Sequence, residues 1–210
     1  MGHPPRPESI MMSAMGVVVS MLRGVNVGSH NRIKMDELRS LYESLKLEDP
    51  RTYVQSGNVI FRTKEKKEAV LAARIQKGIE KKFNCRPEVI LRTAQEMRKA
   101  LAANPFAKRS DIEPAKLLVT FLAAEPQAGA EAALERLKAY PEELHLKGRE
   151  LYIYFPNGAG KSKLPWSSLE KLFKVTGTAR NLNSVTEILK IAEEMEAVMQ
   201  LQLEFFGVGG

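Results

Sequence analysis

Four polar stretches of the sequence concentrate the side chains that could do chemistry. The first, residues 23–34, follows the apolar residues 17–21. An apolar run that breaks into glycine, asparagine and cationic residues before an amphipathic segment is typical of a strand, a loop and a helix. Backbone amides and positive charge then gather where the loop meets the helix. This pattern favours the binding of an anion such as a phosphate group.

The other three stretches, residues 55–58, 157–163 and 180–183, have the same chemical character. The last of them precedes a helix start, where unpaired backbone amides attract an anion. Together the four stretches supply Arg, Lys, Asn, Gln and Ser side chains, with almost no Asp or Glu. The predicted phosphate- or nucleic-acid-binding residues are Arg23, Asn26, Asn31, Arg32, Lys34, Gln55, Ser56, Asn58, Lys161, Lys163, Arg180, Asn181 and Asn183.

Each stretch also has a purely structural explanation. In the first, Asn26 and Asn31 would bond backbone groups while Gly24 and Gly28 adopt positive φ. The second would be an ordinary hairpin turn, the third a flexible glycine-rich turn, and the fourth a network that holds the last helix. The residue types alone leave both explanations open.

The third stretch contains Gly160, Lys161 and Ser162, the residues with which a nucleotide-binding P-loop ends. A P-loop has another glycine five residues before Gly160, and Phe155 occupies that position. The next helix is expected to begin only at Pro165, rather than directly after the Lys-Ser pair. We therefore predict that this loop does not support ATP hydrolysis, and that it is either a looser phosphate site or a turn.

Catalytic groups are scarce in the four stretches. General acid–base and nucleophilic catalysis need a group that titrates near neutrality or an activated nucleophile, and only His30, with Ser29 or Ser56, could serve. We assign no catalytic residue, so anion binding is favoured over catalysis. Cys85 is the single cysteine and there are three histidines, which excludes an internal disulfide and leaves no plausible set of metal ligands. No cofactor is expected.

The overall charge agrees with an anionic partner. The 210 residues include 32 Lys and Arg against 25 Asp and Glu, a formal net charge of +7. Such a charge attracts polyanions over long range. The acidic residues are interspersed with the basic ones, so the charge could instead serve solubility. No run approaches the roughly 18 apolar residues of a membrane span. We expect a cytoplasmic protein without a membrane partner.

The spacing of apolar residues predicts a mixed α+β fold that positions these stretches. Strands are expected at 16–22, 52–55, 58–62 and 87–91, and again at 116–123, 143–146, 149–155 and 176–180. Helices are expected at 35–45, 66–83, 128–140 and 165–173. A further helix should follow a cap at Thr93, and a last one should run from a capping box at Ser184 and Glu187 to about residue 198.

The order strand-helix-strand-strand-helix-strand therefore occurs twice, with a tight hairpin inside each copy. We predict two ferredoxin-like βαββαβ repeats that form a two-lobed α+β chain with a C-terminal helix. The predicted segments are a disordered extension (1–14), a first lobe (15–103), a linker (104–115), a second lobe with the C-terminal helix (116–199) and a tail (200–210). The sequence does not distinguish one shared sheet from two sheets.

Four motifs carry a resemblance to a known family. They are LRGVNVG at 22–28, YVQSGN at 53–58, PNGAGKSKL at 156–164 and GTARNLN at 177–183. In this order they resemble the bacterial family called domain of unknown function 1697, over roughly residues 16–196. The resemblance implies a cytoplasmic protein with two ferredoxin-like lobes. It implies no established activity, so no catalytic residue is carried over.

Three functions remain after these considerations. We predict weak nucleic-acid binding without strong sequence preference, with Tyr53, Tyr152 and Tyr154 available for base stacking if their sheet face is open. One alternative is an enzyme or sensor for a small phosphorylated metabolite, with His30 as acid or base, and another is a self-associating scaffold. Polar loops that converge on one cleft would favour the metabolite, and a surface stripe would favour DNA or RNA.

Overall fold

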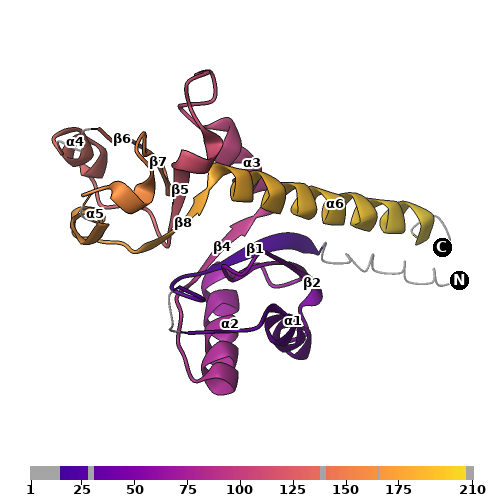
Figure 1. Cartoon of the computed structure of the whole chain (residues 1–210). Coiled ribbons are helices and arrows are strands. Elements are labelled where there is room, and N and C mark those ends of the chain that lie inside the picture. The colour runs from indigo at the N-terminus through magenta and orange to yellow at the C-terminus, as the bar shows by residue number, and fades with distance from the viewer. Residues whose placement is uncertain (1–14, 28–30, 138–140, 165, 207–210) are drawn as a thin grey trace, which may run out of the picture.

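The computed structural model describes residues 15–27, 31–137, 141–164 and 166–206 of the 210-residue chain. These residues form a mixed α+β fold with two four-stranded antiparallel sheets (Figure 1). The strands therefore belong to two separate sheets, an alternative that the sequence had left open.

The first half builds one sheet in the order β2-β3-β1-β4. Its elements are β1 (Gly16–Leu22), α1 (Met35–Ser44), β2 (Glu48–Tyr53), β3 (Asn58–Thr63), α2 (Glu68–Phe83), β4 (Val89–Thr93) and α3 (Ala94–Ala102). Thr93 is the N-cap of α3 and forms the reciprocal capping box with Glu96, so the predicted cap is confirmed.

The second half builds the other sheet in the corresponding order, β6-β7-β5-β8. Its elements are the 3₁₀ turn η1 (Pro114–Lys116), β5 (Leu117–Leu122), α4 (Ala130–Glu135), β6 (Glu143–Lys147), β7 (Glu150–Tyr154), the 3₁₀ turn η2 (Ala159–Lys161), α5 (Trp166–Phe173), β8 (Gly177–Asn181) and α6 (Leu182–Phe206). Within the described residues, no helix has the length and apolar character needed to cross a membrane.

Strand register makes individual residues of the two halves equivalent. Val19 of β1 lies opposite Arg92 of β4, and Val119 of β5 lies opposite Arg180 of β8. Arg92 and Arg180 therefore occupy the same position in their respective sheets. This equivalence is used below to compare the two halves residue by residue.

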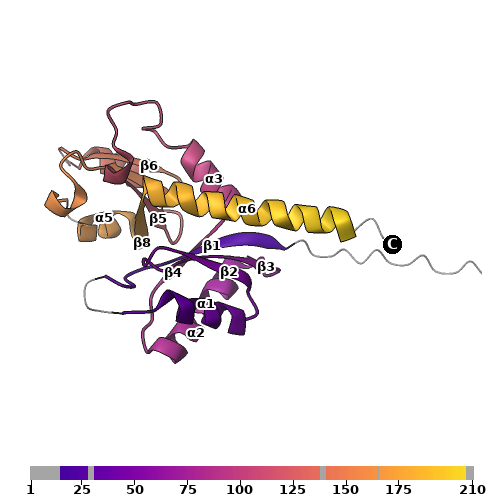
Figure 2. The same ribbon diagram turned by 45° about the vertical axis from the view of Figure 1, so that its right-hand side comes forward.

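The helices form three layers around the two sheets. Helices α1 and α2 cover one face of the first sheet, and α4 and α5 cover the outer face of the second. Helices α3 and α6 lie against the other faces, and α6 runs along the first sheet although it follows the second (Figures 1 and 2). One apolar core joins Val19 of β1, Met97 of α3, Phe121 of β5 and Ile188 of α6. Because successive strand residues alternate between faces, Val18 points instead toward α1 and α2.

The predicted boundaries of two helices are wrong. Helix α6 begins at Leu182, because the side chain of Asn181 accepts a hydrogen bond of 2.8 Å from the backbone N–H of Ser184 and so caps the helix earlier than predicted. It continues to Phe206 rather than ending near residue 198. Helix α4 is shorter than the predicted 128–140, and its buried side chains are Ala130 and Leu134. Residues 138–140 of that prediction lie outside the described residues.

Candidate functional site

Two asparagine side chains hold the loop between β1 and α1. Asn26 Nδ2 donates to the carbonyls of Ile33 (3.0 Å) and Gln55 (2.7 Å), and Asn26 Oδ1 accepts from the Ile33 N–H at 2.8 Å. Asn31 Nδ2 donates to the Gly24 carbonyl at 3.2 Å. Asn26, Asn31 and Gly24 have φ angles of 57°, 51° and 71°. This geometry agrees with the structural explanation of the loop, because both amide groups are used inside the protein.

Arg180 is buried, with only 8% of its surface exposed. Its Nε donates to Asn58 Oδ1 at 2.6 Å, and Nη2 donates to the carbonyls of Leu22 (3.1 Å) and Ser56 (3.0 Å). Burial lowers the pKa of the guanidinium to about 10, so Arg180 is still charged at neutral pH. Because its donors and the buried Asn58 side chain serve each other, the geometry argues against the prediction that either contacts a phosphate.

Arg92 makes the matching contacts from the first half to the second. It is 1% exposed, and its Nε donates to Glu150 Oε1 at 2.9 Å. Its Nη2 donates to the carbonyls of Leu122 (2.8 Å) and Arg149 (3.3 Å). Each half therefore contributes one arginine from its last strand, β4 or β8. That arginine bonds the end of the first strand and the hairpin of the other half. We call Arg92 and Arg180 the paired arginines.

Sequence reasoning missed Arg92. The signal that could have found it is its place in the sequence, because Arg92 directly precedes the helix cap at Thr93, much as Arg180 lies just before the last helix. The burial of Arg92 depends on a partner about thirty residues further along the chain, at Leu122.

Arg23 is engaged by two carboxylates where the halves meet. Its Nη2 lies 2.5 Å from Glu170 Oε1 of α5, and its Nη1 lies 3.6 Å from Glu88 Oε2. Glu88 also accepts a hydrogen bond of 2.5 Å from the Thr176 hydroxyl. Arg23 is therefore already neutralised, which weakens the prediction that it binds a phosphate.

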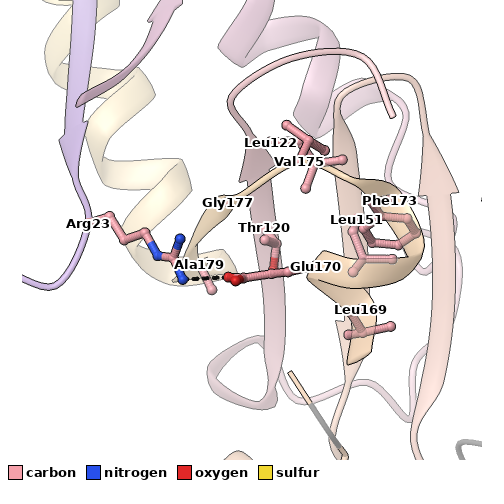
Figure 3. A pocket seen from close by; sticks show the side chains of 10 residues that line it. All are labelled: Arg23, Thr120, Leu122, Leu151, Leu169, Glu170, Phe173, Val175, Gly177 and Ala179. Atoms are coloured by element: carbon pink, nitrogen blue, oxygen red, sulfur yellow. Dashed lines mark hydrogen bonds and ion pairs between the residues drawn. The ribbon is translucent and has the colours of Figure 1, made fainter. Parts of the chain in front are cut away.

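A cavity of about 220 Å³ opens beside Arg23 (Figure 3). Most of its wall is apolar, and Arg23 and Glu170 meet at one end. The residues that line it are Arg23, Thr120, Leu122, Leu151, Leu169, Glu170, Phe173, Val175, Gly177 and Ala179. Arg23 is the one predicted binding residue in this wall, so the polar loops do not converge on this cavity.

The remaining predicted cations lie on the surface. The side chains of Arg32, Lys161 and Lys163 are exposed and make no hydrogen bond or ion pair with another described residue. Lys34 lies 3.9 Å from Glu37.

The predicted Asn, Gln and Ser residues that remain are partly exposed to solvent and partly bonded within the protein. Gln55 and Asn183 are exposed, Ser56 Oγ bonds Asn58 Nδ2 at 2.8 Å, and Asn181 caps α6. Phe155 ends the buried strand region before the Gly-Lys-Ser turn.

The sheet face on which base stacking would depend is closed, so the condition for that part of the prediction is not met. Tyr152 and Tyr154 are buried, and the Tyr152 hydroxyl donates to the Ala100 carbonyl at 2.6 Å. Tyr53 is partly buried against the same core. The reason is that α3 and α6 cover this face of the sheets. Ser29 and His30, the candidate catalytic pair, lie outside the described residues.

Metal-ligand clusters are missing from the part of the chain that the structure describes: no three His, Cys, Asp or Glu side chains are grouped as a metal ion would need.

A different set of cations lies on and around α2. Residues 64–86 contain eight Lys and Arg against three Glu, a net charge of +5. Exposed Lys67, Arg74, Lys77 and Lys81 form no ion pair with another described residue. By contrast, Arg39, Arg51, Arg98, Arg109 and Arg149 are all paired with carboxylates. Lys67, Arg74, Lys77 and Lys81 are called the α2 stripe below.

Residues 15–152 match the family described as "Protein of unknown function (DUF1697)", which is more than half of the chain. The chain belongs to the DUF1697 family. Two of the four motifs of this DUF1697 protein, at 22–28 and 53–58, lie inside the match, and those at 156–164 and 177–183 follow it. The resemblance seen in the sequence is therefore confirmed.

A search of curated proteins found no match to the DUF1697 chain. Among solved structures it is similar to the one titled "The structure of conserved bacterial protein SP0830 from Streptococcus pneumoniae". The two share 22% sequence identity and a TM-score of 0.64, over 85% of this chain and 99% of that chain. A similarity at this level concerns the fold, because one fold hosts many functions.

Proposed function

We propose that this protein binds nucleic-acid phosphates weakly and without strong sequence preference, mainly through the α2 stripe. The observation that carries the proposal is a contrast between two groups of surface cations. Arginines elsewhere on the surface form ion pairs with carboxylates, whereas the cations of the α2 stripe form none with another described residue. Cations without carboxylate partners keep their full attraction for phosphate, since no neighbouring charge must be displaced.

The spacing of the α2 stripe suits a linear polyanion. Lys67 is the N-cap of α2 and Lys81 lies in its last turn. At about 1.5 Å per residue these two positions are about 21 Å apart, and the four side chains cover less than about a third of the helix circumference. Duplex DNA carries one charge per about 1.7 Å of axis, so a stripe of this length spans several phosphates.

The surface loops supply a second set of contacts. Arg32, Lys161 and Lys163 are exposed and, like the α2 stripe, have no carboxylate partner among the described residues. We retain them as auxiliary phosphate contacts. The small phosphorylated metabolite is less well supported, because Arg23 at the cavity mouth already has two carboxylate neighbours, which repel a phosphate.

We also propose that the two halves are ferredoxin-like repeats of one another. Support comes from the identical element order, the matching strand orders β2-β3-β1-β4 and β6-β7-β5-β8, and the equivalent positions of the paired arginines. The two additional helices, α3 and α6, cover the sheet faces on which Tyr152 and Tyr154 lie. Base stacking therefore has no part in the proposed binding.

The test is fluorescence anisotropy with a labelled 20-nucleotide single strand and the corresponding duplex, at two salt concentrations. We expect Arg74→Ala/Lys77→Ala/Lys81→Ala to weaken binding of all sequences at least about tenfold at low salt. The slope of log K against log salt should flatten by about three units, because each lost phosphate contact removes about 0.9 for duplex DNA. Arg32→Ala/Lys161→Ala/Lys163→Ala should have a smaller effect.

The matched control is Lys99→Ala/Lys108→Ala/Lys190→Ala, which removes the same charge from exposed positions outside both sets. It should change binding by less than about twofold, since screened distant charges contribute little. Equal losses in all three variants would indicate a general charge effect and contradict the proposal. So would the lack of any binding at low salt.

A further inference from the structure

Two small residues of β8 form part of the wall of the cavity beside Arg23, where the first half has larger ones. Strand register makes Gly177 equivalent to Val89 and Ala179 equivalent to Leu91. Val89 and Leu91 are buried in the core of the first half, whereas Gly177 and Ala179 line the cavity. A Cβ at Gly177 would lie 2.9 Å from Thr120 Cγ2 and 3.0 Å from the Phe121 carbonyl oxygen, so this position excludes a side chain.

A buried hydroxyl in the cavity wall has no partner. Thr120 is 7% exposed, and its Oγ1 makes no hydrogen bond with any described residue. In the first half the equivalent Ser20 Oγ bonds the Tyr42 hydroxyl of α1 at 2.8 Å. In the second half, α4 follows β5 as α1 follows β1, but it is shorter and provides no such partner for Thr120. A buried polar group without a hydrogen bond is costly, so a ligand that bonds Thr120 gains the missing interaction.

The charge at the mouth selects the ligand head group. Arg23 and Glu170 line the cavity, and Glu88, outside its wall, lies 3.6 Å from the same guanidinium, so two carboxylates surround the one cation. Figure 3 shows Arg23 reaching toward Glu170 on α5, and Thr120 lines the same cavity. The side chains of Arg23, Glu170 and Glu88 are each roughly one-third exposed, so water and a ligand can reach them. A protonated amine complements this excess negative charge, whereas a carboxylate or phosphate opposes it.

We infer that this cavity binds a small primary amine with an apolar body, the ammonium at Glu170 and Thr120 and the body against Leu169 and Phe173. A cavity of about 150 Å³ holds benzene, so a volume of about 220 Å³ suits roughly nine non-hydrogen atoms. The inference goes beyond the proposed function and does not depend on it, because the cavity shares no residue with the α2 stripe.

The experiment titrates the full chain with three probes of one shape and different charge: 2-phenylethylamine, 2-phenylethanol and phenylacetate. Amide chemical shifts in two-dimensional NMR report both the affinity and the site. We expect 2-phenylethylamine to bind with a Kd of about 1 mM or tighter. It should bind at least about tenfold more tightly than the alcohol, with phenylacetate weakest, as expected for a charge-assisted hydrogen bond. The shifts should centre on β5, β8 and α5.

Three variants locate the binding. Ala179→Leu introduces the residue that the first half has at the equivalent position, so it should fill the cavity and abolish binding. Glu170→Gln should remove the preference for the amine over the alcohol. Thr120→Val keeps the side-chain shape and should weaken amine binding about fivefold, the effect of one hydrogen bond. Glu187→Gln, at an exposed carboxylate of α6, is the control and should change nothing.

Several results would overturn the inference. They are the absence of saturable shifts up to about 10 mM amine, tighter binding of phenylacetate than of the amine, and unchanged binding in Ala179→Leu. Should Ala179→Leu fail to fold, as judged by circular dichroism, the isosteric Thr120→Val variant still decides. Unchanged amine affinity in Thr120→Val together with an unchanged amine preference in Glu170→Gln would show that these groups do not recognise a ligand.

Discussion

Replacing Arg180 with methionine should cost a large part of the stability of this protein. The substitution keeps much of the side-chain length but removes all donors, which leaves Asn58 Oδ1, the buried Leu22 carbonyl and the partly buried Ser56 carbonyl without this partner. Each orphaned acceptor costs about 1–3 kcal/mol. We expect a loss of about 3–6 kcal/mol, against a total of about 5–15 kcal/mol for a typical protein.

The measurement is equilibrium unfolding in urea, followed by tryptophan fluorescence and circular dichroism. Arg180→Lys should lose less, about 2–3 kcal/mol, because an ammonium group can serve some but not all of the acceptors. Arg136→Met, at an exposed position on the C-cap of α4, is the matched control and should stay within about 0.5 kcal/mol of the wild type.

The equivalent Arg92→Met should cost at least as much stability as Arg180→Met. It also leaves the carboxylate of Glu150, whose side chain is only 17% exposed, without its ion-pair partner. The reasoning would be refuted by a loss below about 1 kcal/mol in Arg180→Met with an unchanged denaturant slope. Such a result would mean that water or a shifted side chain readily replaces the guanidinium.

Two further predictions concern buried and partly buried polar groups. Ser20→Ala should destabilise the protein by about 1–2 kcal/mol in urea unfolding, because the buried Tyr42 hydroxyl loses its partner. Thr120→Val should leave stability unchanged or raise it by up to about 1 kcal/mol, because the hydroxyl that it removes has no partner among the described residues. Equal losses of stability in the two variants would contradict the prediction. Although burial raises the pKa of Glu96, the hydrogen bonds from Thr93 and the charges of Arg149 and Arg92 lower it below its ordinary value of 4.5. The ionised Glu96 therefore stabilises the protein, by at most about 1 kcal/mol for this partly exposed group, above pH 4.5, and this contribution is lost as the pH falls further. The free energy of unfolding of Glu96→Gln, measured between neutral and acidic pH, should therefore decline less steeply than that of the wild type.

The strands that pair within one half followed from local pattern. Apolar alternation and tight turns predicted β1, β3 and the second hairpin within a residue or two. The start of β2 was missed by four residues, because Asp49 has a positive φ of 47° and the pairing with β3 shifts between Glu48 and Arg51. A register shift of this kind breaks the two-residue period on which the prediction depends.

The candidate site was less predictable, because burial there depends on the other half of the chain. Arg180 looked like an exposed cation before a helix, and only the arrival of β1 and the first hairpin turns it into a buried one. Tyr152 and Tyr154 alternate as a stacking face would, yet α3 and α6 cover them. The sequence contains the positive charge of residues 64–86, but we predicted no binding residue there, because its lack of ion-pair partners became clear only from the fold.

The crossing of α3 and α6 bears on how this chain could be divided. Arg98 of α3 bonds Glu193 and Glu196 of α6 at 2.9 and 3.0 Å, and the sheets meet through one common core. A fragment ending after α3 and a fragment beginning at η1 would each display an apolar face that matches the other. Two fragments produced by cutting the exposed segment near residue 110 should therefore reassociate, with the paired arginines fixing their relative orientation. Such a pair is a natural starting point for a split-protein reporter.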